Sequence, residues 1–413
     1  MTIRLRNPLA GLPRDGRLLF ATRFIRLYAY GALAVVLLLY LTERGFSPAA
    51  AGALLTVALL GDTAVSLWIT TTADRTGRRR MLVAGAVLML LAGIAFAATR
   101  NVVLLVIAAA VGIISPSGNE VGPFLAIEQA SLSQLTPSAQ RTRVFAWYNL
   151  AGSVATALGS LSAGLATRLL QAHGISTIAS YQWIVIGYAA IGILLGAIFL
   201  TLGRDVEVAR PAVDGPRRLF GLHRSRGVVF RLAALFAMDA FAGGFIMQSI
   251  VAYWFHVRFG ADTATLGAVF FAANLLAAVS ALTASRIAAR IGLVNTMVFT
   301  HLPSQVLLIL VPLMPSLSLA VAVLLLRYTI SQMDVPTRQS YTMAVVHPDE
   351  RSAAAGVTGV ARTTGAAISP SIAGTLIGSQ ALLSVPFFVA GGLKIVYDLL
   401  LYRNFRKREP LAG

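Results

Sequence analysis

The sequence of 413 residues contains no cysteine, five histidines and two lysines, and charged residues make up only 12% of it. Without cysteine, the chain forms no disulfide, no thiolate metal site and no cysteine nucleophile. The histidines do not occur at metal-ligand spacing, and the motifs His-Glu-x-x-His, Gly-x-Ser-x-Gly and the phosphate loop are absent. We therefore expect no metal, no cofactor and no enzymatic activity.

Hydrophobic residues make up 57% of the sequence, which is typical of a membrane protein and excludes most soluble classes. A membrane span needs about 20 apolar residues, so a chain of this length has room for about twelve spans. The first 17 residues carry four arginines and lack the apolar core of a cleavable signal. We expect a monomeric, multi-pass protein of the cytoplasmic (inner) membrane, in contact with the lipid bilayer.

The apolar runs form two sets of six, separated by a polar stretch. The first set comprises 18–42, 48–72, 81–99, 102–130, 143–170 and 180–203. The second set comprises 228–257, 263–289, 294–314, 316–345, 352–379 and 383–402. The sequence therefore predicts an all-α membrane protein with a six-helix bundle at 1–203, a cytoplasmic linker at 204–227 and a second six-helix bundle at 228–413.

The two halves also share a register. Four pairs of identical residues are separated by 215 positions: Gly45 and Gly260, Gly52 and Gly267, Arg75 and Arg290, and Gly77 and Gly292. This agreement indicates a duplication, and two parallel six-helix repeats are typical of transporters whose bundles rock about a central site.

The net charge of +18 comes from arginines that gather in alternate loops. Loops rich in arginine stay on the cytoplasmic side of a membrane, so we expect both termini to be cytoplasmic. This distribution accounts for the basic charge without a nucleic-acid partner.

The run that follows the second predicted helix, Asp74-Arg75-Thr76-Gly77-Arg78-Arg79, resembles the loop signature between helices 2 and 3 of the major facilitator superfamily. The resemblance implies a secondary transporter with twelve helices in two bundles, and a cytoplasmic gate that includes Asp74, Arg75, Gly77 and Arg78. Asp74 can accept hydrogen bonds from a facing helix N-terminus, which makes the loop a charge latch. A solvated basic turn is the alternative interpretation.

Other segments fit the same family less specifically. The second-half counterpart of the signature keeps Arg290 and has lost the acid. The segments around Glu128 and Arg141, and around Arg351, resemble further inner gates of the family. With Arg338, these residues complete the predicted cytoplasmic gate.

The helix predicted at 352–379 carries Gly365, Ser369-Pro370 and Ala373-Gly374, a pattern similar to the glycine-proline motif of drug:proton antiporters in the superfamily. Close packing of small residues is the alternative interpretation.

Ionisable residues inside apolar runs are costly and therefore indicate function. The predicted cavity charges are Arg26, Asp62, Glu120, Asp239, Arg327, Asp334 and Arg362. Arg26 and Asp239 lie at similar places in their repeats, so we expect them to pair across the bundles, either as a proton-coupled pair or as a static one. Asp239 is the first candidate for a proton carrier and Glu120 is the second.

Two runs predict broken helices. Residues 115–123 hold two prolines and two glycines around Asn119 and Glu120, and residues 331–336 place Asp334 next to a proline. Each break is compatible with a substrate site or a gating hinge. Tyr30, Asn119 and Tyr328 are the predicted substrate contacts.

These features predict a secondary active transporter that works by alternating access, with a small molecule and protons as partners. Proton-coupled export of a small organic compound is the first hypothesis. The alternative is a uniporter, symporter or exchanger of an organic or phosphorylated anion, bound by Arg26, Arg327 and Arg362.

Overall fold

The computed structural model describes residues 11–119, 122–207, 222–347 and 350–406, which form helices and no strands. The first half contains α1 (Arg14–Glu43), α2 (Pro48–Thr76), α3 (Arg78–Ala98), α4 (Val102–Val111), α5 (Phe124–Leu135), α6 (Ser138–Ala172) and α7 (Thr177–Leu200). The second half contains α8 (Arg226–Gly244), α9 (Gln248–Phe259), α10 (Thr263–Ile291), α11 (Leu293–Leu310), α12 (Leu317–Tyr328), α13 (Asp334–Ala344), α14 (Arg351–Ile377) and α15 (Val385–Phe405).

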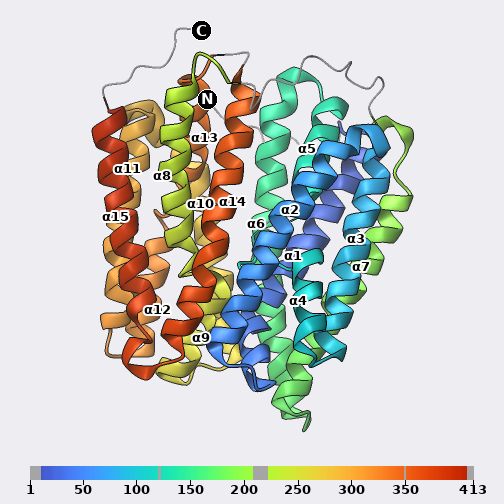
Figure 1. Cartoon of the computed structure of the whole chain (residues 1–413), viewed down its shortest axis with the longest axis vertical. Coiled ribbons are helices and arrows are strands. Elements are labelled where there is room, and N and C mark those ends of the chain that lie inside the picture. The colour runs from blue at the N-terminus through green and yellow to red at the C-terminus, as the bar shows by residue number, and fades with distance from the viewer. Residues whose placement is uncertain (1–10, 120–121, 208–221, 348–349, 407–413) are drawn as a thin grey trace.

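Helices α1–α7 and α8–α15 lie side by side as two bundles (Figure 1). Nine segments of the described chain are long and apolar enough to cross a membrane, with α8 and α9 counted together. The pairs α4–α5 and α12–α13 and the helix α14 run between the same two ends of the molecule as these nine segments (Figure 1). The all-α membrane fold is confirmed. We call the side on which α1 begins and α15 ends the terminal side.

Three of the helical segments that traverse the molecule are interrupted near their middle. The predicted break at 115–123 is confirmed, because α4 ends at Val111 and α5 begins at Phe124. Two glycines in this break, Gly118 and Gly122, have φ angles of +70° and +83°, which other residues rarely adopt. The chain is also broken between α12 and α13, as predicted. The prediction of one continuous helix over 228–257 is wrong, because α8 ends at Gly244 and α9 begins at Gln248.

In each bundle, the first helix packs closely against a later helix through a glycine at an equivalent position. A Cβ on Gly31 of α1 would lie 2.1 Å from the carbonyl oxygen of Thr156 on α6. In the second bundle, a Cβ on Gly244 of α8 would lie 2.6 Å from the carbonyl oxygen of Ala366 on α14. Only glycine allows backbones to approach so closely.

The bundles meet on the side opposite to the terminal side. There α2 crosses α14 at Gly52 and Gly374, and α6 crosses α10 at Gly164 and Gly267. A Cβ on Gly52 would lie 2.4 Å from the carbonyl oxygen of Pro370. Hydrogen bonds reinforce both crossings: Ser371 N to Thr56 Oγ1 at 3.0 Å, and Thr167 to Thr263 at 2.7 Å between hydroxyls. The helices are therefore held together at this end.

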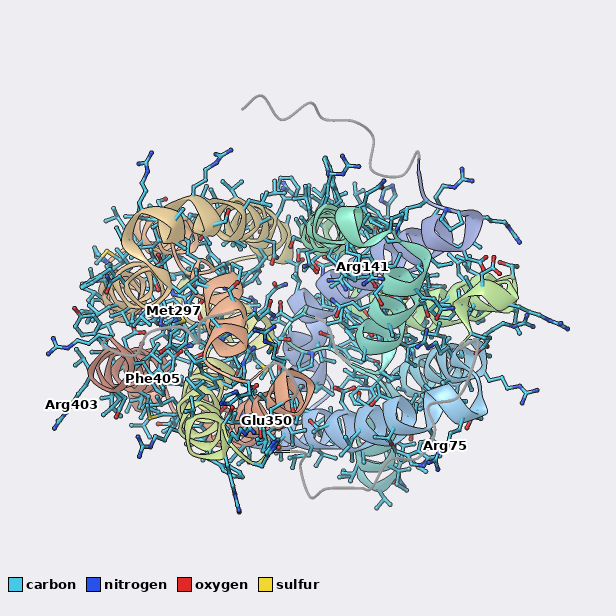
Figure 2. All side chains as sticks on the ribbon, turned by 90° about the horizontal axis from the view of Figure 1, so that it is seen from above. Arg75, Arg141, Met297, Glu350, Arg403 and Phe405 are labelled. Atoms are coloured by element: carbon cyan, nitrogen blue, oxygen red, sulfur yellow. The ribbon has the colours of Figure 1, made fainter. Side chains whose placement is uncertain are left out.

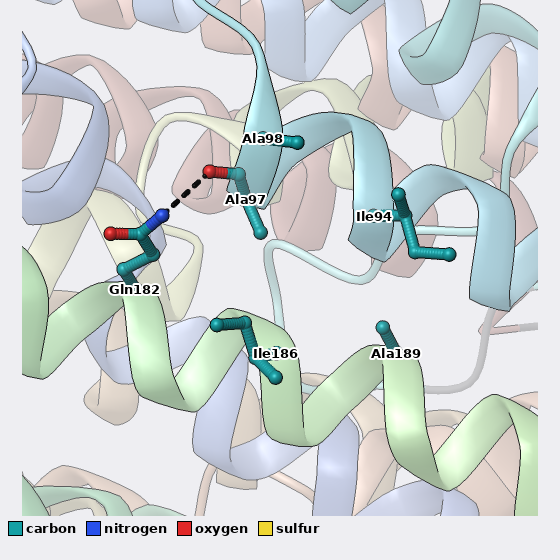
Figure 3. A pocket seen from close by; sticks show the side chains of 6 residues that line it. All are labelled: Ile94, Ala97, Ala98, Gln182, Ile186 and Ala189. Atoms are coloured by element: carbon teal, nitrogen blue, oxygen red, sulfur yellow. Dashed lines mark hydrogen bonds between the residues drawn. The ribbon is translucent and has the colours of Figure 1, made fainter.

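Figure 2 views the terminal side, where Arg75 and Arg141 belong to the first bundle and Glu350, Met297 and Phe405 to the second. A separate pocket of about 250 Å³ lies between α3 and α7, where Gln182 donates to the carbonyl oxygen of Ala97 at 2.9 Å (Figure 3). The pocket lining is apolar apart from Gln182 and includes no charged residue, so we do not place the substrate there.

Candidate transport site

The first bundle contains a fully buried ion pair between α1 and α5. The two terminal nitrogens of Arg26 donate to the two carboxylate oxygens of Glu128, each at 2.8 Å, and both side chains have no exposed surface. Thr22 Oγ1 also donates to Glu128 at 2.9 Å, and Tyr148 donates from α6. The guanidinium carbon of Arg26 lies 4.5 Å from the ring centroid of Phe124. This carboxylate is fully hydrogen-bonded, as a buried charge requires.

This contact corrects one prediction. Arg26 does not pair with Asp239 across the bundles, because α5 packs against α1 and places Glu128 beside Arg26 within the same bundle. Glu128, predicted to belong to the cytoplasmic gate, is completely buried in this contact, and its role in gating stays a prediction. The same contact occupies Arg26, so it does not face a substrate in this conformation.

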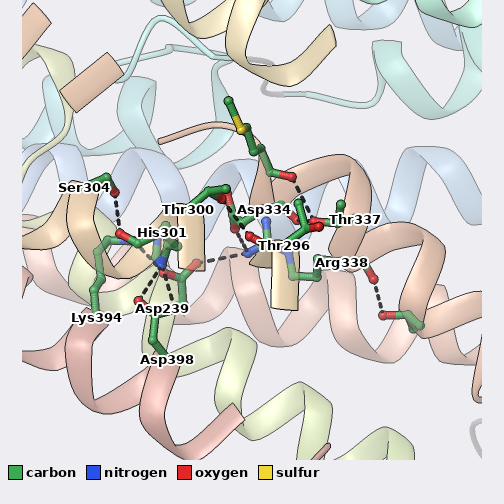
Figure 4. Close-up of polar contacts among 12 residues, drawn as sticks. Asp239, Thr296, Thr300, His301, Ser304, Asp334, Thr337, Arg338, Lys394 and Asp398 are labelled. Atoms are coloured by element: carbon green, nitrogen blue, oxygen red, sulfur yellow. Dashed lines mark hydrogen bonds and ion pairs between the residues drawn. The ribbon is translucent and has the colours of Figure 1, made fainter. Parts of the chain in front are cut away.

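The second bundle contains a larger buried cluster, which we call the C-bundle cluster: Asp239 of α8, His301 of α11, Asp334 and Arg338 of α13, and Lys394 and Asp398 of α15 (Figure 4). Asp239 accepts from Lys394 Nζ at 2.5 Å and from Arg338 Nη1 at 3.1 Å. Arg338 Nη1 also donates to Asp334 at 3.0 Å. The predicted gate residue Arg338 is therefore buried among acids.

The imidazole of His301 joins two of these acids. Its Nδ1 lies 2.9 and 3.1 Å from the two carboxylate oxygens of Asp398. Its Nε2 lies 4.0 Å from Oδ1 of Asp239. The side chain of His301 is 4% exposed and that of Asp398 is completely buried, so these contacts occur away from bulk water.

Two further arginines lie near this cluster. Arg327 is buried, with its guanidinium carbon 5.3 Å from the ring centroid of Tyr328, and Arg362 of α14 is half-buried. Within the described parts of the chain, neither forms an ion pair shorter than 4.0 Å, and the Nε of each is buried without a hydrogen-bond partner. Arg327 and Arg362 are therefore cations that could bind an anionic group.

The ion pairs of the two bundles are related by the repeat. Arg26 and Asp239 are separated by 213 positions, as are Gly31 and Gly244, which make equivalent helix contacts. Glu128 and Arg338 are separated by 210 positions, as are Gly164 and Gly374. The same structural pair is therefore present twice, with the acid and the base exchanged.

The other predicted contacts have different environments. Tyr30 is completely buried and stacks on Tyr188 with ring centroids 6.1 Å apart, and its contact with substrate stays a prediction. Asn119 is exposed in the α4–α5 break, Tyr328 is half-buried, and Asp62 is buried on α2 next to Ser66. Glu120 lies outside the described residues.

The predicted gate residues mostly lie at the terminal side. Arg75, Arg141, Arg290 and Arg351 are exposed there, and the side chain of Asp74 lies outside what the structure describes. Gly77 separates α2 from α3 with a φ angle of +106°.

Arg78 connects the family signature to the end of its own bundle. Its side chain donates to Gln134 at 3.1 Å and to the carbonyl oxygen of Val206 at 3.3 Å. The carboxylate of Glu207 accepts from the backbone nitrogens of Arg78 and Arg79, at 2.7 and 3.1 Å, and so caps α3.

Glu350 plays a similar role at the start of α8. It accepts hydrogen bonds from the backbone nitrogens of His223, Arg224 and Ser225 at 2.5, 2.8 and 2.7 Å. Desolvation raises the pKa of this carboxyl, but hydrogen bonds from Ser225 and the three backbone groups outweigh it and lower the pKa to about 2.

Sequence reasoning missed His301, Lys394 and Asp398. Each lies within a predicted apolar helix, so the rule that flags charges in membrane spans applies to them as well. Lys394 and Asp398 are four residues apart and therefore share one face of α15. Both residues lie in the last predicted helix, and their four-residue spacing is the sequence feature that indicates a shared buried face.

The sequence pattern of the Major Facilitator Superfamily matches residues 19–370, and the chain belongs to this family of membrane transporters. An uncharacterized membrane protein of Saccharomyces cerevisiae, YJR124C, is 29% identical, with 94% of this chain and 93% of that protein covered.

Solved structures with a similar fold are transporters of different solutes. A structure of the nucleoside transporter NupG, 14% identical, has a TM-score of 0.74 and covers 95% of this chain and 100% of its own. A D-xylose-proton symporter, 15% identical, has a TM-score of 0.71 and covers 94% of this chain and 97% of its own. At these identities the likeness establishes the fold alone.

Proposed function

We propose that this transporter couples the export of a small organic compound to protons. The C-bundle cluster carries the proposal, because three carboxylates and an imidazole are buried together in the bundle core. A charge in the hydrocarbon region costs several kcal/mol unless it is paired, so a change of protonation there rearranges the ion pairs. Asp239 is the central group, since it contacts cations from two other helices.

The geometry of the bundles supports alternating access. The crossings at Gly52 and Gly164 hold the side opposite to the terminal side closed. We place the terminal side in the cytoplasm, because Arg75, Arg141 and Arg290 are exposed there and arginine-rich loops stay inside. Closure of the opposite side would then leave access from the cytoplasm, the state in which an exporter takes up its substrate and an importer releases it.

The relatives support parts of this proposal. The D-xylose-proton symporter has the same fold and moves a neutral organic solute with protons. The crossing of α14 with α2 uses Pro370 and Gly374, which belong to the antiporter-like pattern of the sequence.

Transport of an organic or phosphorylated anion is the second candidate. Arg362 and Arg327 favour it, because both are cations without a carboxylate within 4.0 Å among the described residues. Guanidinium groups bind carboxylate and phosphate in a forked geometry. Arg26 no longer contributes, since Glu128 neutralises it.

Proton flux in inside-out membrane vesicles tests both candidates. The vesicles are energised to be acidic inside and are given panels of cationic, neutral and anionic compounds. Proton release on adding a cationic or neutral compound, lost in Asp239→Asn and kept in the control Asp262→Asn, is the expected result. Asp262 caps α10 on the opposite side and has no role in the cluster.

A second variant separates the candidates. Arg362→Gln should leave the flux of cationic or neutral compounds largely intact, whereas an anion carrier would lose transport. If folded wild-type protein releases no protons with any compound, proton-coupled export is wrong.

A further inference from the structure

Four helices bring titratable side chains together in the second bundle. His301 of α11 and Asp398 of α15 contact each other, and neither Lys394 nor Arg338 forms an ion pair with Asp398 among the described contacts. Lys394 and Arg338 neutralise two of the three carboxylates in the cluster. With a neutral imidazole, the six residues in contact carry one excess negative charge. Binding of one proton to His301 removes this excess.

The two ring nitrogens of His301 have different roles. Because Nδ1 faces both oxygens of Asp398, it carries a hydrogen as the donor in this contact. A carboxylate partner of this kind fixes the tautomer of a histidine and leaves the other nitrogen free to accept a proton. That nitrogen, Nε2, lies 4.0 Å from Oδ1 of Asp239.

We propose that His301 and Asp398 form the proton-binding site of the transporter, with the proton held on Nε2, on the side of the ring that faces Asp239, while Nδ1 donates to Asp398; this inference rests on the proposed proton coupling. Once protonated, His301 competes with Lys394 for the same oxygen of Asp239. Lys394 lies on α15 and Asp239 on α8, so the proton changes the charge balance at the contact between these helices.

The surrounding charges come from every helix near the site. Besides Asp239 from α8, the residues facing it are Lys394, Tyr397 and Asp398 from α15, Asp334 and Arg338 from α13, Arg327 from α12 and Arg362 from α14. Four cations oppose the added charge: Lys394 and Arg338 are paired with carboxylates of the cluster, and Arg327 and Arg362 lie beyond contact distance. The two nearest carboxylates, at 2.9 and 4.0 Å, outweigh them because Coulomb energy falls with distance.

Among the residues that the structure describes, the first bundle has no equivalent of this site. Adding 215 to position 86 gives 301, and position 86 is an alanine whose methyl group faces Gly196 of α7. The Arg26–Glu128 pair is also complete without a third group. The proton therefore acts on one bundle only.

Spin-label distances test the proposal without a substrate. The protein lacks cysteine, so Gln140→Cys on α6 and Ser285→Cys on α10 place two labels on exposed positions of different bundles at the terminal side. We expect the population of the longer distance in full-length protein to change about threefold between about pH 5.5 and about pH 8.5, the range in which histidine gains charge.

Matched asparagine variants show which residue causes the pH-dependent change in the spin-label distance. His301→Asn keeps a donor for Asp398 and cannot hold a proton, so it should abolish the change, as should Asp398→Asn. His256→Asn should retain it, because His256 contacts only the carbonyl oxygen of Ala261 on the opposite side. A pH response that persists in folded His301→Asn, or no response in wild-type protein, overturns the proposal.

Vesicle measurements separate this inference from the proposed function. If a panel compound drives proton release in wild-type vesicles and His301→Asn keeps that release, the site is wrong while the function stands. If no compound drives release but the spin labels respond to pH through His301, the proton site stands and the coupled export fails.

Discussion

The two bundles contain the same ion pair with opposite polarity, and they differ in what surrounds it. In the first bundle, Glu128 accepts from Arg26, Thr22 and Tyr148, so its two oxygens are fully occupied. In the second, Asp239 is shared by two cations and approached by an imidazole. A complete pair stabilises one arrangement, whereas a shared carboxylate can exchange partners.

The difference indicates how the duplicated halves diverged. Both keep the helix crossings on which the architecture depends, including Gly31 and Gly244 within the bundles and Gly52 and Gly267 between them. The third and sixth spans of the second half, α11 and α15, carry His301, Lys394 and Asp398 in their interiors, whereas the only charged residues of α3 are the arginines of its first turn and α7 has none. We infer that the first bundle is a rigid partner and the second is the responsive one.

The largest expected effect comes from breaking the complete pair. Glu128→Ala leaves the buried guanidinium of Arg26 without a carboxylate, and such a loss costs about 3–5 kcal/mol of folding free energy. We expect a large fall in the melting temperature of the detergent-purified protein, or little folded protein at all.

The double variant Arg26→Met with Glu128→Met is the control, because it removes both charges and should recover most of the stability. If Glu128→Ala melts like the wild-type protein, the pair does not stabilise the first bundle as described.

An intermediate effect should come from the crossings, where the two halves are alike. Gly52→Leu places a side chain where a Cβ alone would meet a carbonyl oxygen at 2.4 Å, and Gly267→Leu does so at 2.6 Å. Overpacking of this kind costs about 1–3 kcal/mol. The conformation closed on the side opposite to the termini should lose population about 5- to 150-fold in both variants.

Cysteine cross-linking across α2 and α14, and across α6 and α10, measures this closure. Gly359→Leu is the matched control, because no atom lies within 4 Å of the position its Cβ would occupy. Unequal effects of Gly52→Leu and Gly267→Leu would show that the crossings are not equivalent.

The fold was largely predictable from the sequence, because hydrophobic runs and Gly/Pro clusters are local signals. The succession of apolar helices and the breaks near Asn119 and Asp334 follow from them. The break between Gly244 and Gln248 was not predicted, since Phe245, Ile246 and Met247 are as apolar as the helices beside them.

The partners of the buried charges could not be predicted in the same way. Depth along a helix places Arg26 and Asp239 at similar levels, but pairing depends on which face of each helix looks inward. That choice is made by packing between distant segments, such as α5 against α1 and α15 against α8. The roles of the predicted gate and cavity residues stay predictions.

The smallest expected effect concerns the two carboxylates that cap helices at the terminal side. Glu350→Ala removes three backbone hydrogen bonds at the start of α8, and Glu207→Ala removes two at the start of α3. Losing a helix cap costs about 1 kcal/mol, so backbone amides near each start should exchange hydrogen about fivefold faster at neutral pH.

Lowering the pH tests whether Glu350 stabilises the start of α8 through its charge. Because folding lowers the pKa of Glu350 from 4.5 to about 2, its carboxylate stabilises the folded chain fully above pH 4.5, and this contribution is lost as the pH falls toward 2. The difference between Glu350→Ala and wild-type protein in the equilibrium opening of residues 225–229, measured by hydrogen exchange, should therefore shrink as the sample is acidified through that range. A difference that stays constant down to about pH 2 would show that Glu350 acts through packing rather than through its charge.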